Sequence, residues 1–354
     1  YFGNNFDFSY ENFKITLDNI DSLNMKFQTD EKNMYGRAVR QTIDNTIENL
    51  SGDIYIDKPD NKSGKENYPN YPIFESRQKS YVYYDELFNG PYKRKNFYFE
   101  LDTFKMDSLD NFKPENLKFK GNFHSANIFP EFRETLMLRE DNSLGLVKDT
   151  PDSGFPLYEG KGTYYNTIDM SNQGLRGEGK LAYLTAEAVT DDILFFPDST
   201  SIHADKFNIE QQTTGIEYPK VKGNGINIKW FPHENVMHTE QTDQPYTMYN
   251  DSTTMQGKLK LKPTGLTGRG KLDLSKAVLR SQYFTYKARS FYADTANFKL
   301  RTLDREEFAF LSDTLNARID FDYQRGRFRS IENYSISEFQ KNNYLGYINK
   351  FSWK

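Results

Sequence analysis

The 354-residue chain contains no cysteine and only four histidines. Without cysteine it has no disulfide, no thiolate metal ligand and no thiol nucleophile. A chain without disulfides suits the Gram-negative envelope as well as the cytosol. Because the chain has only four histidines, metal binding or catalysis through imidazole groups would depend on very few positions.

Long apolar runs and an excess of positive charge are also missing. No run of about 18 apolar residues occurs, so the sequence predicts no helix that crosses a bilayer. Lys and Arg number 46 against 50 Asp and Glu, and the net charge of −4 argues against a nucleic-acid partner. The chain begins with Tyr1 rather than methionine and stops after strand-like residues at Lys354. We expect either a processed chain or an excised piece of a longer protein, and favour the piece.

Aromatic residues, in contrast, are abundant. Phe and Tyr number 29 and 25, although the mean hydropathy is −0.82. Each buried aromatic side chain contributes roughly 1.5–3 kcal/mol, which allows a polar chain to fold. This balance favours strands with aromatic residues on one face and polar residues on the other, and so predicts a mainly β fold.

One glycine-rich segment occurs twice. Gly174-Leu175-Arg176-Gly177-Glu178-Gly179-Lys180-Leu181 returns as Gly265-Leu266-Thr267-Gly268-Arg269-Gly270-Lys271-Leu272, with six of eight positions identical. The glycine order does not match a dinucleotide or phosphate loop, and no helix pattern follows. We expect each copy to be a turn that starts a strand, with glycine supplying positive φ.

Each copy is followed by a change of strand face beside an acidic residue. Apolar residues switch from even to odd numbers around Asp205, from odd to even around Asp294, and again around Asp313. An uninterrupted strand keeps its parity, so each switch requires a bulge or a corner. The chain is therefore expected to form an elongated body of bent strands: a β-solenoid, a β-jellyroll or a twisted sandwich.

The first half reads as less regular. Val39, Ile43, Ile47 and Leu50 have helical spacing and predict one helix near residues 34–50, with a broken strand pair as the alternative. Long loops are predicted at about 58–72 and 140–157. These features divide the chain into an irregular β region, 1–160, and a repeated β region, 161–354.

Several residues are candidates for metal binding or catalysis, but the sequence predicts no catalytic, cofactor or metal site. His233 and His238 are five apart in a loop-like stretch, not four apart on a helix as in zincins. His124 falls on the polar face of its strand, and His203 flanks the corner at Asp205. Neither shows a nucleophile–base arrangement.

Three further groups have a functional and a structural interpretation. An acidic cluster suits Ca²⁺ or simple turns, and turns are favoured. The basic stretch 91–95 suits an anionic glycan or lipid head group, or a solvated turn. Trp residues suit sugar stacking or core packing. The acidic cluster consists of Asp191, Asp192 and Asp198, and the two Trp residues are Trp230 and Trp353.

The segments Ala293-Asp294-x-x-x-Phe298 and Asp313-Thr-Leu-Asn-Ala-Arg-Ile-Asp-Phe321 resemble the stacked strands of OstA-like β-jellyroll proteins of lipopolysaccharide transport. The wider chain is similar to large, uncharacterised β-rich envelope proteins of Gram-negative bacteria. The OstA-like resemblance implies an extended β-structure that carries lipid in a groove. It covers about the last half of the chain.

We therefore expect a non-catalytic structural and interaction segment of a large cell-envelope or surface protein, periplasmic or outer-membrane-associated. Its partners would be other envelope proteins or the rest of its own chain, with glycan or lipid as further candidates. The alternatives are a lipid or glycolipid conduit of the OstA-like type, and a polysaccharide-processing β-helix enzyme.

Overall fold

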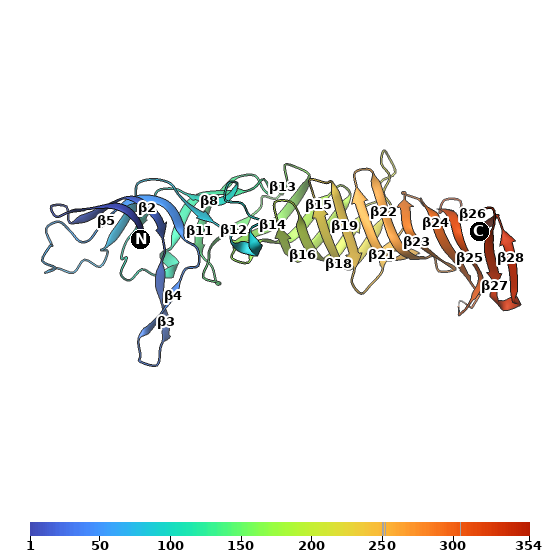
Figure 1. Ribbon diagram of the computed structural model, residues 1–354, viewed down its shortest axis with the longest axis horizontal. Coiled ribbons are helices and arrows are strands. Elements are labelled where there is room, and N and C mark those ends of the chain that lie inside the picture. Colours follow the sequence, from blue (N-terminus) through green and yellow to red (C-terminus); the bar gives the residue numbers. More distant parts are fainter. Residues whose placement is uncertain (250, 252, 305) are drawn as a thin grey trace. The chain divides into compact units, whose positions relative to one another are not determined.

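The computed structural model describes residues 1–249, 251, 253–304 and 306–354, with the backbone alone for 28 and 30. The chain is mainly β, as predicted: the described residues form 29 strands and three 3₁₀ helices of three residues each (Figure 1). The 3₁₀ helices are η1 (Leu87–Asn89), η2 (Pro114–Asn116) and η3 (Gln340–Asn342). No helix of the described residues has the length and apolar character needed to cross a bilayer.

The chain divides into two compact units. Unit 1 comprises Tyr1–Glu159, Thr167–Gly177 and Phe195–Pro197, and unit 2 the remainder. The strands of unit 1 are β1 (Phe2–Ser9), β2 (Lys14–Leu23), β3 (Lys26–Lys32), β4 (Ala38–Thr42), β5 (Ile47–Tyr55), β6 (Ile73–Ser76), β7 (Ser80–Tyr83), β8 (Phe97–Leu101), β9 (Lys105–Met106), β10 (Lys118–Ser125), β11 (Phe132–Leu138), β12 (Leu144–Asp149) and β13 (Phe155–Leu157).

Unit 2 is a succession of antiparallel strands that mostly pair with their sequence neighbours. Strands β14 (Gly162–Ser171), β15 (Gly174–Tyr183) and β16 (Ala186–Phe195) contribute residues to both units. The others are β17 (Thr200–Ile209), β18 (Val221–Phe231), β19 (Val236–Gln241), β20 (Tyr246–Met248), β21 (Thr253–Lys262), β22 (Gly265–Asp273), β23 (Ala277–Tyr286), β24 (Ser290–Arg301), β25 (Phe308–Asp320), β26 (Arg325–Ser330), β27 (Ser335–Phe339), β28 (Tyr344–Ile348) and β29 (Lys350–Trp353).

The helix predicted near residues 34–50 is wrong. The hairpin of β3 and β4 and the start of β5 occupy this stretch. Ile47 and Leu50 are both fully buried although they are three apart, because Asn49 has a positive φ of 61° within β5. The partner strand β2 bends with it, since Ile20 and Leu23, opposite Leu50 and Ile47, are also buried and three apart. A bend of this kind brings two residues three apart to the same face, and so imitates helical spacing.

The two predicted long loops have different outcomes. No strand forms between β5 and β6, as expected for the loop at 58–72. The loop predicted at 140–157 is wrong in part, because it contains β12 and β13. Leu144 and Leu146 of β12 are fully buried. Apolar content thus outweighed the glycine and proline residues that suggested a loop.

The face switches fall where the sequence places them. In β17, Ala204 and Phe207 are buried while Asp205 and Lys206 between them are exposed. The pairing of β24 with β25 shifts register between Ala293 and Ala296. β17 keeps its register with β18 through its switch, whereas β24 has a bulge. In both cases one strand directs apolar side chains inward on both sides of the bend.

The interior of unit 2 is filled by side chains. Trp230, Phe284, Tyr286 and Phe291 have no solvent-accessible surface. A side chain that borders a water-sized cavity would show such surface, so these aromatic residues pack directly against their neighbours. No lipid-sized space separates them.

Candidate functional site

The two histidines with metal-like spacing lie on a hairpin. His233 is in the turn between β18 and β19, where Asn235 has a φ of 51°. His238 lies in β19, opposite Lys229 and Lys260, so the predicted loop is wrong at this residue. Partial burial and Lys260 lower the pKa of His238. The described residues contain no group of three His, Asp or Glu side chains that suits a metal ion.

The other histidines make pairwise contacts on their strands. The His124 ring stacks on Tyr98 at 4.5 Å between centroids, and its Nδ1 lies 3.5 Å from Glu131. Nδ1 of His203 lies 2.7 Å from Oδ1 of Asn227 on the neighbouring strand. None of these contacts joins a histidine to a hydroxyl nucleophile, so they support no acyl-transfer chemistry.

The acidic cluster near residue 195 is a set of bends. Asp191 and Asp192 are exposed at the face switch of β16. The Thr190 hydroxyl accepts a hydrogen bond from the Asp192 backbone N–H at 3.1 Å. The Ser199 hydroxyl donates to Asp198 at 2.9 Å. These contacts fit the turn interpretation, since they fix backbone bends rather than converge on one point.

The basic stretch at 91–95 is partly buried. Tyr92 is inaccessible to solvent, and its hydroxyl donates to the Phe195 carbonyl at 2.7 Å and accepts from the Leu175 N–H at 3.2 Å. Burial raises the pKa of Tyr92 to about 12. Arg94 forms ion pairs with Glu48 and Asp85. The stretch therefore holds unit 1 together.

The Trp230 ring is not accessible for stacking against a sugar. The ring is fully buried and lies 4.9 Å from the Tyr183 ring. Trp353 is half-buried, with its ring 6.2 Å from Phe298. Core packing accounts for both contacts.

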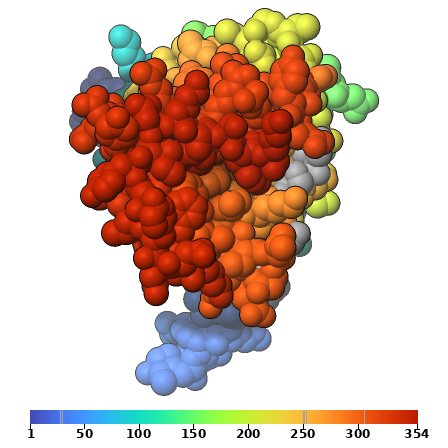
Figure 2. Space-filling view, turned by 90° about the vertical axis from the view of Figure 1, so that its right-hand side faces the viewer, coloured from blue at the N-terminus to red at the C-terminus, as the bar shows by residue number. Residues whose placement is uncertain are grey.

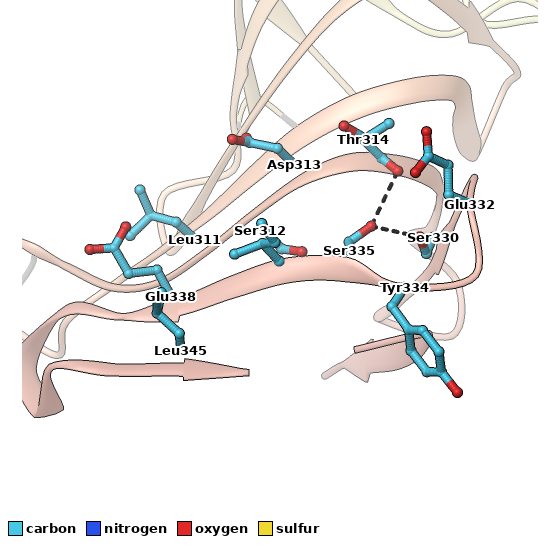
Figure 3. Close-up of a pocket in the computed structure, with 11 residues that line it drawn as sticks. Leu311, Ser312, Asp313, Thr314, Ser330, Glu332, Tyr334, Ser335, Glu338 and Leu345 are labelled. Atoms are coloured by element: carbon cyan, nitrogen blue, oxygen red, sulfur yellow. Dashed lines mark hydrogen bonds between the residues drawn. The ribbon is translucent and has the colours of Figure 1, made fainter. Parts of the chain in front are cut away.

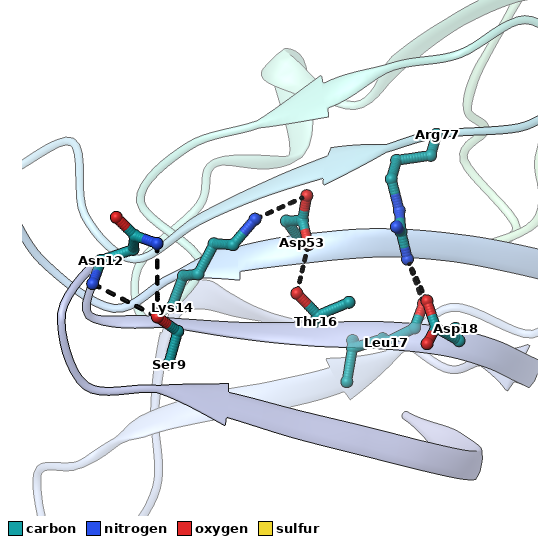
Figure 4. Close-up of polar contacts among 8 residues, drawn as sticks. All are labelled: Ser9, Asn12, Lys14, Thr16, Leu17, Asp18, Asp53 and Arg77. Atoms are coloured by element: carbon teal, nitrogen blue, oxygen red, sulfur yellow. Dashed lines mark hydrogen bonds and ion pairs between the residues drawn. The ribbon is translucent and has the colours of Figure 1, made fainter.

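A polar cluster joins β2 and β5 in unit 1 (Figure 4). Asp53, 9% exposed, accepts a hydrogen bond from the Thr16 hydroxyl at 2.8 Å and pairs with Lys14 at 3.3 Å. Arg77 pairs with Asp18 at 2.6 Å nearby. All carboxylates in the cluster have partners, so it serves strand pairing.

A pocket of about 390 Å³ lies beside the face switch of β25 (Figure 3). Its lining combines apolar side chains such as Leu311 and Leu345 with the carboxylates of Asp313, Glu332 and Glu338. At its base the Ser335 hydroxyl donates to the Ser330 hydroxyl at 2.8 Å. These two hydroxyl groups hydrogen-bond to each other, and the three carboxylates are exposed at the surface.

Several strand edges are free in the described part of the chain, including those of β1, β9, β28 and β29. Among the described residues, β1 pairs with β2 alone and β28 with β27 alone. Both edges carry exposed apolar residues, including Phe8 at 55% and Tyr347 at 74%. The C-terminal strands lie at the surface of unit 2 (Figure 2). Unpaired N–H and C=O groups beside apolar side chains are a ready template for another strand.

A groove of about 660 Å³ lies on the outer face of β19 and β21–β24 in unit 2. We call it the cationic groove. Its floor includes Gly257 and Gly270, which lie opposite each other in the β21–β22 ladder. It is lined by Glu240, Gln241, Gln256, Gly257, Lys258, Arg269, Gly270, Lys271, Arg280, Ser281, Gln282, Thr295 and Asn297.

Sequence reasoning missed the cationic groove. Lys271 and Arg280 are nine residues apart, and they meet only because the turn between β22 and β23 places them directly opposite. The signal that was present is the second glycine-rich segment, which contributes Arg269, Gly270 and Lys271. The sequence predicts for that segment a turn that starts a strand, and no binding role. Its Gly265 does begin a strand, β22, as predicted.

Comparison with known proteins found no matching family model, curated protein or solved structure.

Proposed function

We propose that this chain is a non-catalytic structural and interaction segment of a larger bacterial cell-envelope protein. The filled interior carries the proposal. Strands of 9 to 13 residues, from β21 to β25, bend at bulges while their inward aromatic residues pack together. Such construction makes an ordered body with long outer faces.

The free edges support an interaction role. β1 and β28 each expose backbone groups and apolar side chains, which in other β-proteins are covered by a further strand. We propose that another envelope protein, or another part of the same protein, supplies that strand.

The alternatives receive less support. A lipid conduit needs an apolar groove, whereas the inward aromatic residues described for unit 2 pack directly against their neighbours. We therefore expect a fluorescent fatty acid to show no saturable binding to the purified chain. Saturable binding would favour the conduit. A β-helix enzyme needs convergent carboxylates, whereas the pocket and cluster carboxylates described above form pairs or face solvent.

Location and size are tested on native cells with an antibody raised against this chain. We expect the antigen in the envelope fraction, in a polypeptide longer than 354 residues. Detergent extraction and intact-mass analysis provide the measurement. Recovery of the antigen in the cytosol would contradict the proposed envelope role.

A further inference from the structure

The cationic groove has a local charge opposite to that of the whole chain. Four cationic side chains line it, at Lys258, Arg269, Lys271 and Arg280, while the chain carries a net charge of −4. Glu240 is the one carboxylate among the described lining residues, and it pairs with Lys258 at 2.6 Å. The groove thus has an excess of three positive charges.

Three of these cations have no acidic partner within the described part of the chain. No ion pair joins Arg269, Lys271 or Arg280 to a carboxylate there. Asp273 interacts electrostatically with Lys271, but its carboxylate is held by both terminal nitrogens of Arg301. The cations are therefore free to bind an external anion.

The strand register places like charges directly opposite one another. Lys258 faces Arg269 across the β21–β22 ladder, and Lys271 faces Arg280 across the β22–β23 ladder. Like charges at directly opposed positions destabilise a sheet. An anion bound between them would remove this repulsion.

The remaining lining residues indicate what kind of anion fits. Gln256, Gln282 and Asn297 offer amide donors and acceptors, whereas the Gln241 amide oxygen accepts a hydrogen bond from the Gly257 N–H at 3.0 Å. Amides complement sugar hydroxyl groups by hydrogen bonding in both directions. No aromatic residue is among the described lining residues, so the groove lacks the stacking platforms typical of single-stranded nucleic-acid sites.

The extent of the groove suits a polymer. It crosses five neighbouring strands, β19, β21, β22, β23 and β24. With strands about 4.8 Å apart, this corresponds to roughly 19 Å. We propose that the cationic groove binds an anionic polysaccharide, whose carboxylate, sulfate or phosphate groups lie on Arg269, Lys271 and Arg280 and whose hydroxyl groups meet the amides.

This inference deepens the proposed interaction role and rests on it, but the two can fail separately. Cell fractionation reports on location and size, whereas binding by the purified chain reports on the groove alone. The probes are polygalacturonate and dextran sulfate, with neutral dextran, inorganic phosphate and oligo(dT) for comparison. Binding is measured by isothermal titration calorimetry at low ionic strength.

The test variant is K271Q/R280Q, and the matched control is R318Q/R327Q. Arg318 and Arg327 also face each other directly, on β25 and β26, and lie outside the groove. We expect both anionic polymers to bind the unmodified chain, and K271Q/R280Q to bind about tenfold more weakly. The control should keep its affinity within about twofold, and added salt should weaken binding through screening.

A second readout confirms folding of the variant. Without ligand, K271Q/R280Q should be at least as stable as the unmodified chain in urea unfolding, because a like-charge contact is removed. Equal loss of binding in the control would overturn the groove assignment. So would neutral dextran binding as tightly as polygalacturonate, inorganic phosphate competing fully at millimolar concentration, tighter binding of oligo(dT), or no binding of either anionic polymer.

Discussion

The two units use the same kind of core but pair their strands differently. In unit 2, β21 to β25 form successive ladders between sequence neighbours. In unit 1, β5 pairs with β2, β6 and β7, and β8 pairs with β7 and β10. These unit 1 ladders depend on contacts between separated segments, whereas the ladders from β21 to β25 in unit 2 repeat a local rule.

This difference leads to a claim about stability. If both units are held mainly by buried aromatic residues, a large-to-small substitution in either core should have a similar cost. If instead the long ladders of unit 2 provide most of its stability, a large-to-small substitution in its core should lower the free energy of unfolding by less than the same substitution in unit 1.

The largest expected effect is that of Phe291→Ala in unit 2. Phe291 is fully buried, with its ring 5.8 Å from Phe284 and 6.1 Å from Phe321. We expect a loss of about 3–5 kcal/mol in the free energy of unfolding, measured with urea. The matched control is Tyr292→Ala at the next residue, which is 40% exposed and should change stability by no more than about 0.5 kcal/mol.

The same substitution in unit 1 completes the test. Phe97 is fully buried, with its ring 4.1 Å from Tyr92 and 5.4 Å from Phe123. Phe97→Ala should also cost about 3–5 kcal/mol. A clearly smaller cost for Phe291→Ala than for Phe97→Ala would show that ladders rather than aromatic packing hold unit 2.

The same difference decides what the sequence could predict. In unit 2, the second glycine-rich segment correctly predicted a strand that starts at Gly265, β22, whose partners are its neighbours β21 and β23. The switch at Asp294 correctly predicted a bulge or corner, since a bulge lies there, and the change of buried face predicted around Asp205 is confirmed. In these strands the pattern of one segment is enough, because its partners are its neighbours and follow the same alternation.

Prediction failed where a local exception or a distant partner decides the structure. The bend at Asn49, where φ is 61°, gave β5 the spacing of a helix, and no residue in 34–50 reveals the strands that pair with it. The sequence did not predict the cationic groove for a related reason. It requires the cross-strand register of Lys271 and Arg280, which depends on the turn between β22 and β23.

A second prediction compares glycines of the repeated segment with a loop glycine. Gly179 and Gly270 have φ values of 146° and 141°, and a Cβ at either would lie 2.1 Å from a backbone carbonyl oxygen. Replacement of either by alanine should cost about 1–3 kcal/mol through backbone strain, before any cost of the clash. Because the two copies share this geometry, the two losses should be similar.

Gly64 in the long loop of unit 1 provides the contrast. Its φ is 63°, and a Cβ there would meet nothing within 4 Å. Gly64→Ala should therefore cost only the left-handed penalty of about 1 kcal/mol. Urea unfolding of the three variants gives the comparison, and a loss at Gly64 as large as at Gly270 would show that the close backbone approach is unimportant.

The smallest effect concerns one ion pair in each unit. In unit 2, Arg301 contacts both carboxylate oxygens of Asp273 at 2.8 and 2.6 Å, and the two side chains are 19% and 25% exposed. In unit 1, Arg77 and Asp18 are 43% and 51% exposed. Asp273→Asn should cost about 1–3 kcal/mol, whereas Asp18→Asn should cost about 0–1 kcal/mol because solvent screens the exposed pair.

The pH dependence separates a charge effect from a hydrogen-bonding effect at Asp273. The hydrogen bonds from Arg301 lower the pKa of Asp273 in the folded chain. The unfolded carboxyl group, with a pKa near 3.9, binds its proton first as pH falls. The pair therefore stabilises the fold above about pH 4, and this contribution is lost as pH falls toward the lower folded pKa. Asp273→Asn should accordingly destabilise the chain at pH 7 and lose most of that effect near pH 2, as followed by urea unfolding at both values. A cost that is the same at both pH values would mean that the loss comes from the hydrogen bonds and not from the charge, because the asparagine NH2 group cannot accept a hydrogen bond from Arg301.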